Sequence, residues 1–192
     1  LVYFPNPTTA MNMVIRSLDL GPGDEVLSSN HEYGAVEKTW RFISKKRGFL
    51  YNAIDIPIPF SDDDFLSRLK SSVNKRTKVI FLSHITSPTA IRFPIEEICR
   101  WARKKGILTI IDGAHAPAQI NLDLRSLGAN IYTGACHKWM LCPKGVSFLY
   151  CERSIQNQLS PLVVSWGWES DSPSGSNFLD HHQYQGTNDI SA

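Results

Sequence analysis

The stretch K-V-I-F-L-S-H, residues 78–84, is an almost continuous apolar run that ends in polar residues. A run without alternation of apolar and polar residues is typical of a strand whose sheet is covered on both faces. The run I-L-T-I-I at 107–111 has the same character and ends at Asp112. Shorter runs of strand type lie at 25–29, 51–56, 130–133 and 145–151. The chain therefore contains the strands of a buried sheet.

Helical patterns separate these strands. Apolar residues one turn apart occur in each of four segments: Ala10, Met13 and Val14; Val36, Trp40 and Ile43; Phe65, Leu66, Leu69 and Val73; Ile95, Ile98, Cys99 and Ala102. Strands alternating with helices predict an α/β domain with a mostly parallel sheet flanked by helices. Residues 165–177, rich in Ser, Gly, Pro and Trp, break the alternation and are expected to form a long loop.

The composition of the chain argues against several classes of partner. The 192 residues include 20 basic and 18 acidic side chains, and this balance argues against a nucleic-acid partner. No apolar run approaches the roughly 20 residues that span a bilayer, so no membrane partner is expected. The four cysteines show no zinc-type spacing, and we expect reduced thiols and a cytoplasmic protein. Because the chain opens on apolar Leu1 and stops after a turn-rich patch, we also expect a fragment of a longer protein.

Polar residues gather where the predicted strands end. They form four groups: His31–Tyr33, His84–Ser87, Asp112–His115 and His137–Lys138. Ligands of open α/β sheets bind just past the carboxyl ends of the strands. These four groups can therefore converge on one crevice.

Lys138 stands between Cys136–His137 and the apolar pair Trp139–Met140. Burial disfavours the ammonium form, lowers the pKa of a lysine and makes its amine a usable nucleophile. Amines of this kind form Schiff bases with carbonyl compounds, including pyridoxal phosphate. The alternative is that Lys138 reaches into solvent, as most lysines do.

Asp112 follows an apolar strand and begins the string D-G-A-H. A buried carboxylate needs a cationic partner, and a protonated pyridine nitrogen is one such partner. The alternative is that Asp112 caps the turn that follows. Asp112 and His115 could also hold a metal ion, but no third ligand has a comparable position, so no metal site is expected.

The polar turn at 6–9 precedes the first helical pattern. A helix N-terminus with free N–H groups and the hydroxyls of Thr8 and Thr9 can bind an anion. The alternative is an ordinary N-cap.

Seven short strings occur in one order along the chain: N-P-T-T-A (6–10), G-P-G-D-E-V (21–26), N-H-E-Y-G-A (30–35), S-H-I-T-S-P-T-A (83–90), I-D-G-A-H-A (111–116), H-K-W (137–139) and Q-G-T-N-D (185–189). With them the chain resembles the large domain of class V aminotransferases, the pyridoxal-phosphate family that also holds the cysteine desulfurases, and within it the isopenicillin N epimerase-like branch. The resemblance implies the fold type I architecture. It also implies that residues 1–192 are the large, cofactor-binding domain without an N-terminal segment and a C-terminal small domain.

The resemblance implies a role for individual residues. Lys138 matches the lysine that holds the cofactor and then shuttles the substrate Cα proton, and Asp112 matches the aspartate paired with the pyridine nitrogen. His115 and Ser87 match residues near the phenolic oxygen of the cofactor. Thr9, with Thr8 beside it, and His137 match residues at the phosphate. Tyr33 matches the residue stacked on the ring, and His31 is the less favoured stacking residue. Gly186 and Thr187 match a segment that reaches the phosphate of the neighbouring subunit, which implies a homodimer with a shared active site. Ala135 departs from the pattern, because relatives often carry a serine or asparagine there.

The implied function is a pyridoxal-phosphate enzyme that moves the Cα proton of an amino acid, as isopenicillin N epimerase-like proteins or class V aminotransferases do. A cysteine desulfurase or cysteine-type β-lyase is the enzymatic alternative. An alternative of another class is a non-catalytic ligand-binding module. The pairing of Lys138 with Asp112 argues against that module, because binding alone does not require an amine nucleophile.

Overall fold

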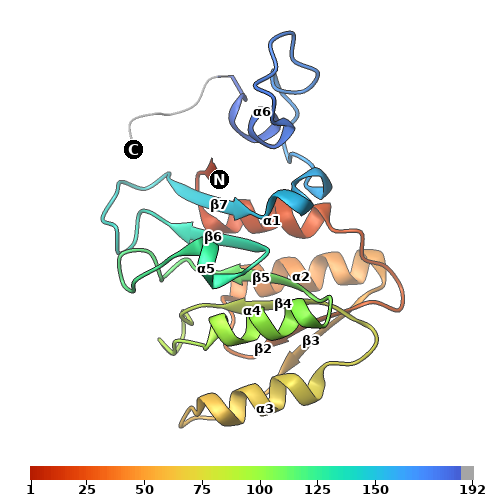
Figure 1. Ribbon diagram of the computed structural model, residues 1–192, viewed down its shortest axis with the longest axis vertical. Helices are drawn as coiled ribbons and strands as arrows, with labels where there is room; N and C mark the ends of the chain where they lie inside the picture. Colours follow the sequence, from red (N-terminus) through yellow and green to blue (C-terminus); the bar gives the residue numbers. More distant parts are fainter. Residues whose placement is uncertain (187–192) are drawn as a thin grey trace.

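One sheet organises the computed structural model, which describes residues 1–186 (Figure 1). Its seven strands lie in the order β1-β7-β6-β5-β4-β2-β3. The strands are β1 (Val2–Phe4), β2 (Glu25–Ser29), β3 (Leu50–Ile54), β4 (Thr77–Ser83), β5 (Leu108–Asp112), β6 (Ile131–Ala135) and β7 (Ser147–Cys151). The strands β2 to β6 pair in parallel, whereas β7 is antiparallel to both of its neighbours. The prediction of a mostly parallel sheet is confirmed.

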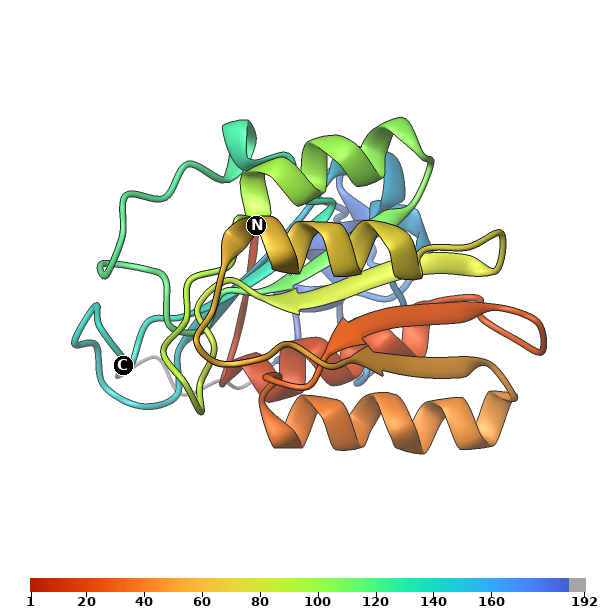
Figure 2. The same ribbon diagram turned by 90° about the horizontal axis from the view of Figure 1, so that it is seen from below.

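Helices cover both faces of this sheet. They are α1 (Pro7–Ser17), α2 (Gly34–Arg47), α3 (Asp62–Ser72), α4 (Ile95–Lys104), α5 (Leu124–Leu127) and α6 (Asn177–Gln183), with a 3-10 helix at Arg153–Gln158. One buried cluster packs α1 and α2 against one face, and a second packs α3 and α4 against the other. Figure 2 shows the sheet between α2 on one side and α3 and α4 on the other. Both faces of β4 are therefore buried, as its apolar run predicts.

Aromatic side chains fill the middle of each cluster. Trp40 of α2 is fully buried and packs against Tyr51 and Phe81, with ring centroids 6.2 and 5.6 Å away. On the other face Phe65 of α3 stacks on Phe93, with centroids 4.3 Å apart. These contacts pack α2 and α3 into the clusters on opposite faces of the sheet.

Several element boundaries differ from the predicted ones. The strand expected at 51–56 is β3, which ends at Ile54. The reason is that the side-chain oxygen of Asn30 accepts from the Ile56 N–H at 3.0 Å, so the chain leaves the sheet before that residue. The sequence reading did not predict β1, the 3-10 helix or the short helices α5 and α6.

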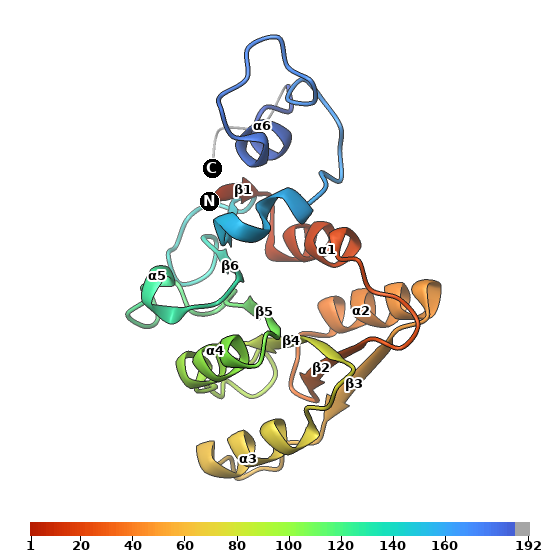
Figure 3. The same cartoon turned by 45° about the vertical axis from the view of Figure 1, so that its right-hand side comes forward.

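The C-terminal part of the described chain lies beyond the β1 edge of the sheet (Figure 3). Residues 165–176 contain neither helix nor strand, as predicted, and α6 follows them. It is held to β1 by a hydrogen bond from Gln183 Nε2 to the Tyr3 carbonyl at 3.2 Å and by a ring contact between His182 and Phe4. Within residues 1–186, the helices are too short or too polar to cross a membrane.

Candidate active site

The carboxyl ends of neighbouring parallel strands bring the predicted polar groups to one edge. The strands β6, β5, β4 and β2 are consecutive in the sheet, and Thr133, Asp112 and Ser83 lie in one row across three of them. Lys138 follows β6 and Tyr33 follows β2 beyond this row. The four groups therefore follow the carboxyl ends of neighbouring strands at one edge of the sheet.

The start of α1 reaches the same edge. Because β1 and β6 are both antiparallel to β7, they run in the same direction. Phe4, Ser147 and Ala135 lie in one row, and the Ser147 hydroxyl donates to the Phe4 carbonyl at 2.9 Å. The helix α1 begins three residues after Phe4, so its N-terminus lies on the side of the sheet edge where His137 leaves β6.

Lys138 and His115 are in direct contact. The Lys138 Nζ lies 3.0 Å from His115 Nε2, and the lysine side chain is half-buried. Burial lowers the pKa of Lys138, and the nearby charge of Asp112 opposes this effect. Burial and then the charge of Lys138 lower the pKa of His115. Lys138 therefore does not extend freely into solvent.

Asp112 is a buried acid with few protein partners. Its side chain is almost wholly enclosed, and Oδ1 accepts a hydrogen bond from the Ala114 N–H at 3.0 Å. Within residues 1–186 this is the only hydrogen bond to the carboxylate. Burial raises the pKa of Asp112, whereas the Ala114 N–H and the charge of Lys138 lower it. The turn-capping alternative thus accounts for one oxygen, and the other can receive a cationic ligand.

Glu32 is a second buried acid, which the sequence reading missed. Its carboxylate accepts from the Ser29 hydroxyl at 2.6 Å and from the hydroxyl and N–H of Ser83 at 2.6 and 2.8 Å. Burial raises the pKa of Glu32 to about 8, and the charge of Asp112 adds to this rise. The signal available in the sequence was an acid three residues after a short strand that ends in Ser28 and Ser29.

Asn6 is the N-cap of α1. Its Oδ1 accepts from the Thr9 N–H at 2.8 Å and from the Thr9 hydroxyl at 3.1 Å. The N-cap interpretation is therefore correct for Asn6. The Thr8 hydroxyl forms no hydrogen bond to any residue in the described part, so it stays available to a ligand.

Tyr33 and His31 occupy different surroundings. The Tyr33 side chain is 45% exposed, whereas His31 is 6% exposed. The His31 ring nitrogens lie 3.0 Å from the Thr89 hydroxyl and 2.8 Å from the Ile56 carbonyl. His31 is thus held by the fold, while the Tyr33 ring can meet a ligand.

The remaining predicted residues are more scattered. His137 is half-buried and its Nδ1 lies 3.2 Å from the Val146 carbonyl, whereas Ser87 is exposed in the turn after β4. Ala135 is fully buried in β6. Gly186 lies beside Trp166, whose Cδ1 would be 3.4 Å from a Cβ built on this glycine. Thr187 lies outside the described residues.

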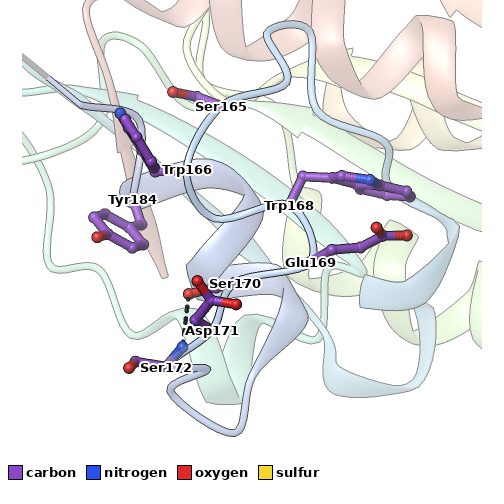
Figure 4. A pocket seen from close by; sticks show the side chains of 8 residues that line it. All are labelled: Ser165, Trp166, Trp168, Glu169, Ser170, Asp171, Ser172 and Tyr184. Atoms are coloured by element: carbon purple, nitrogen blue, oxygen red, sulfur yellow. Dashed lines mark hydrogen bonds between the residues drawn. The ribbon is translucent and has the colours of Figure 1, made fainter.

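A hollow in the C-terminal segment is separate from the strand ends (Figure 4). Its lining residues are Ser165, Trp166, Trp168, Glu169, Ser170, Asp171, Ser172 and Tyr184. Although Gly186 lies close to Trp166, the lining contains none of the predicted site residues. Within residues 1–186, three or more metal-ligating side chains do not come together at any point.

The profile of the aminotransferase class-V family matches residues 1–187. The chain belongs to this family. Class-V relatives include the isopenicillin N epimerase of Amycolatopsis lactamdurans, 34% identical over 98% of this chain and 48% of the relative. They also include the putative L-cysteine desulfhydrase 1 of Oryza sativa subsp. japonica, 30% identical over 88% of this chain and 36% of the relative. The chain thus spans half or less of the length of these curated relatives.

A solved structure has a fold similar to that of this chain. The cystine C–S lyase C-DES, in complex with its reaction product cysteine persulfide, superposes with a TM-score of 0.80 at 23% identity. The match covers 97% of this chain and 56% of the lyase. The chain therefore shares its overall fold with this lyase.

Proposed function

We propose that residues 1–192 are the large domain of a pyridoxal-phosphate enzyme that moves the Cα proton of an amino acid. One observation carries this proposal: the half-buried amine of Lys138 contacts His115 and faces the buried charge of Asp112 at the carboxyl edge of the sheet. An ordinary surface lysine has neither a lowered pKa nor a buried acid opposite it. The family membership supports the same conclusion.

The chemistry of the site suits pyridoxal phosphate. An aldehyde requires an uncharged amine, which Lys138 can supply because burial lowers its pKa. A protonated pyridine nitrogen requires an anion, and one Asp112 oxygen has no hydrogen-bond donor among residues 1–186. A phosphate requires donors, and the start of α1 with the Thr8 hydroxyl supplies them.

In the proposed reaction, Lys138, Asp112 and His115 have different roles. The cofactor supplies an electron sink for a broken bond at the substrate Cα. Lys138 attaches the cofactor and, once free, accepts and returns the Cα proton as general base and acid. Asp112 keeps the pyridine nitrogen protonated, and His115 orients the Lys138 amine at 3.0 Å.

Other residues bind the cofactor in this proposal. Tyr33 stacks on the cofactor ring, for which its side chain is sufficiently exposed. Thr8, Thr9 and His137 serve the phosphate, and Ser87 lies near the phenolic oxygen. Gly186 and Thr187 serve the phosphate of a second subunit, so the proposal includes a homodimer with a shared site. A cytoplasmic location completes this proposal.

A cysteine β-lyase is the second candidate, favoured by the desulfhydrase relative. A β-lyase needs no enzyme thiol, since loss of the substrate sulfur follows removal of the Cα proton. A desulfurase needs a reactive cysteine, and because Cys99, Cys136 and Cys151 are buried, such a cysteine would have to come from outside this domain or from Cys142. Cys142 is half-buried within the loop that follows Lys138. Burial raises the pKa of Cys151 to about 12, which makes this thiol a poor nucleophile.

The first test is chemical capture of the cofactor in the purified full-length protein. Borohydride reduction in the presence of pyridoxal phosphate should fix the cofactor on Lys138, as read by peptide mass spectrometry. Lys138→Ala should abolish the attachment, and Lys144→Ala, in the same loop but exposed, should leave it unchanged. A folded protein without attachment at Lys138 contradicts the proposal and favours a non-catalytic binding module.

The second test separates the reactions. With amino acids in deuterated water, label at Cα with inversion indicates an epimerase, whereas a keto acid formed from the substrate without loss of a side-chain group indicates a transaminase. With L-cysteine, release of sulfide, pyruvate and ammonia indicates a β-lyase, whereas alanine with sulfur left on the enzyme indicates a desulfurase. A protein that attaches the cofactor but catalyses no exchange at Cα of any amino acid contradicts the proposed reaction.

A further inference from the structure

Three side chains at the site form a chain of hydrogen bonds. The Trp139 Nε1–H donates to His115 Nδ1 at 3.3 Å, and His115 Nε2 lies 3.0 Å from the Lys138 Nζ. Trp139 directly follows Lys138 and is 50% exposed, so its indole lies at the open side of the site. The proposed reaction gives no role to this indole.

Counting the protons in this chain fixes the state of each group. An indole N–H can only donate, so His115 Nδ1 must be an acceptor and carries no proton. A neutral imidazole carries one ring proton, and here that proton is on Nε2. The Nε2–H then donates to Lys138 Nζ. An ammonium group has no lone pair to accept it, so the lysine must be the uncharged amine.

We infer that Trp139 is a positioning residue that holds His115 in its Nε2–H tautomer and thereby holds Lys138 as a free amine. This inference rests on the proposed function in one respect, since it assumes that the Lys138 amine is the group to be kept reactive. Without the indole, Nδ1 can take the ring proton, Nε2 becomes an acceptor, and a Lys138 ammonium can donate to it. The two arrangements have the same geometry of heavy atoms and opposite proton positions.

The charges around Lys138 make such a device useful. Asp112 raises the pKa of Lys138, although burial lowers it more. Glu32 is a buried acid that interacts with Asp112, and burial favours its neutral form. His137 is the adjacent imidazole and its Nδ1 faces the Val146 carbonyl, away from this chain of bonds. The hydrogen bond from His115 therefore lowers the pKa of Lys138, as burial does, and opposes the effect of Asp112.

The test uses the full-length protein without cofactor, so that it is independent of catalysis. Nitrogen NMR of histidine-labelled protein, assigned with His115→Gln, reports the tautomer. The pH dependence of trace acetylation by acetic anhydride, read by peptide mass spectrometry, reports the apparent pKa of Lys138, with Lys144 of the same loop as internal reference. The variant is Trp139→Phe, which keeps an aromatic ring and removes only the donor. Trp101→Phe on α4 is the matched control.

In the unmodified protein we expect the Nε2–H tautomer and an apparent pKa of Lys138 below that of Lys144. In Trp139→Phe we expect the Nδ1–H tautomer to appear and the pKa of Lys138 to rise by about half a unit to one unit, the effect of losing one neutral hydrogen bond. Trp101→Phe should match the unmodified protein.

An Nδ1–H tautomer in the unmodified protein overturns the inference, and so does a Trp139→Phe variant with tautomer and Lys138 pKa both unchanged. Failure of the proposed function is recognised separately. In that case borohydride capture at Lys138 fails in the unmodified protein, whatever the NMR and acetylation data show.

Discussion

The Glu32 carboxylate accepts two hydrogen bonds from Ser83, one from its hydroxyl at 2.6 Å and one from its N–H at 2.8 Å. This contact joins the loop after β2, which carries Tyr33, to the end of β4 beside Asp112. A single buried acid thus holds together two of the strand ends from which the proposed site is built.

Glu32→Gln should make the protein more stable at alkaline pH and reduce the pH dependence of its stability. The folded protein raises the pKa of Glu32 from 4.5 to about 8, so between these values the folded state binds more protons than the unfolded state. Stability due to this group is complete below about pH 4.5 and is lost as the pH rises toward 8. A glutamine stays neutral, and its oxygen can still accept from Ser83. We expect the free energy of unfolding of Glu32→Gln, relative to that of the unmodified protein, to be about 1–3 kcal/mol larger at pH 8 than at pH 5.

The measurement is the melting temperature of the full-length protein, without cofactor, across this pH range. Glu97→Gln is the control, because Glu97 is exposed and pairs with Lys70 at 2.7 Å on the surface. A variant whose melting temperature runs parallel to that of the unmodified protein from pH 5 to 8 would show that Glu32 is already ionised at the lower pH.

Asp112→Asn should weaken cofactor binding while leaving the fold intact. The asparagine oxygen can still accept from the Ala114 N–H, but the buried negative charge is lost. Removing one member of a buried charge pair typically costs at least about tenfold in affinity, and we expect at least that rise in the dissociation constant for pyridoxal phosphate. Asp55→Asn, at an exposed contact with Asn30, is the control for the same exchange. Equal affinity in Asp112→Asn and the unmodified protein would remove Asp112 from the cofactor site.

Tyr33→Ala should lower the affinity for pyridoxal phosphate by roughly tenfold, and Tyr33→Phe should not, because stacking needs the ring and not the hydroxyl. His31→Ala should instead lower the melting temperature, since its ring bonds to Thr89 and the Ile56 carbonyl. Fluorescence titration with the cofactor and thermal melting separate the two effects. If His31→Ala, still folded, lost more affinity than Tyr33→Ala, the stacking residue would be His31.

Local patterns were enough to predict the central part of the fold. The apolar runs that became β4 and β5 have no polar alternation because helices cover both of their faces. Parallel neighbours put their polar ends on one edge, so the positions of Asp112 and Lys138 followed from the order of elements alone. The role of Lys138 stays a prediction, which its mostly apolar surroundings in the sequence suggested and the resemblance to class V aminotransferases implied.

What the sequence did not reveal depends on contacts between distant residues. β1 has three residues and exists because it pairs with β7. The burial of Glu32 depends on Ser83, 51 residues away, and local reasoning places a loop glutamate at the surface. The contact between Trp139 and His115 spans 24 residues and depends on the meeting of two strand ends.

Gly113→Ala should destabilise the protein through a clash under the site. A Cβ at Gly113 would lie 2.0 Å from Cζ of Tyr132, whose ring is fully buried and whose hydroxyl is 2.9 Å from His84 Nδ1. The ring cannot move away without breaking that hydrogen bond, so we expect a loss of about 3 kcal/mol, the upper end for overpacking. Gly21→Ala, which meets no atom within 4 Å, should change stability by less than about 0.5 kcal/mol. Chemical denaturation of the full-length variants measures both effects.

In a Tyr132→Leu background the added cost of Gly113→Ala should be smaller, because the atoms that clash are gone. An equal cost in both backgrounds would place the strain in the backbone turn after Asp112 rather than in the Tyr132 ring.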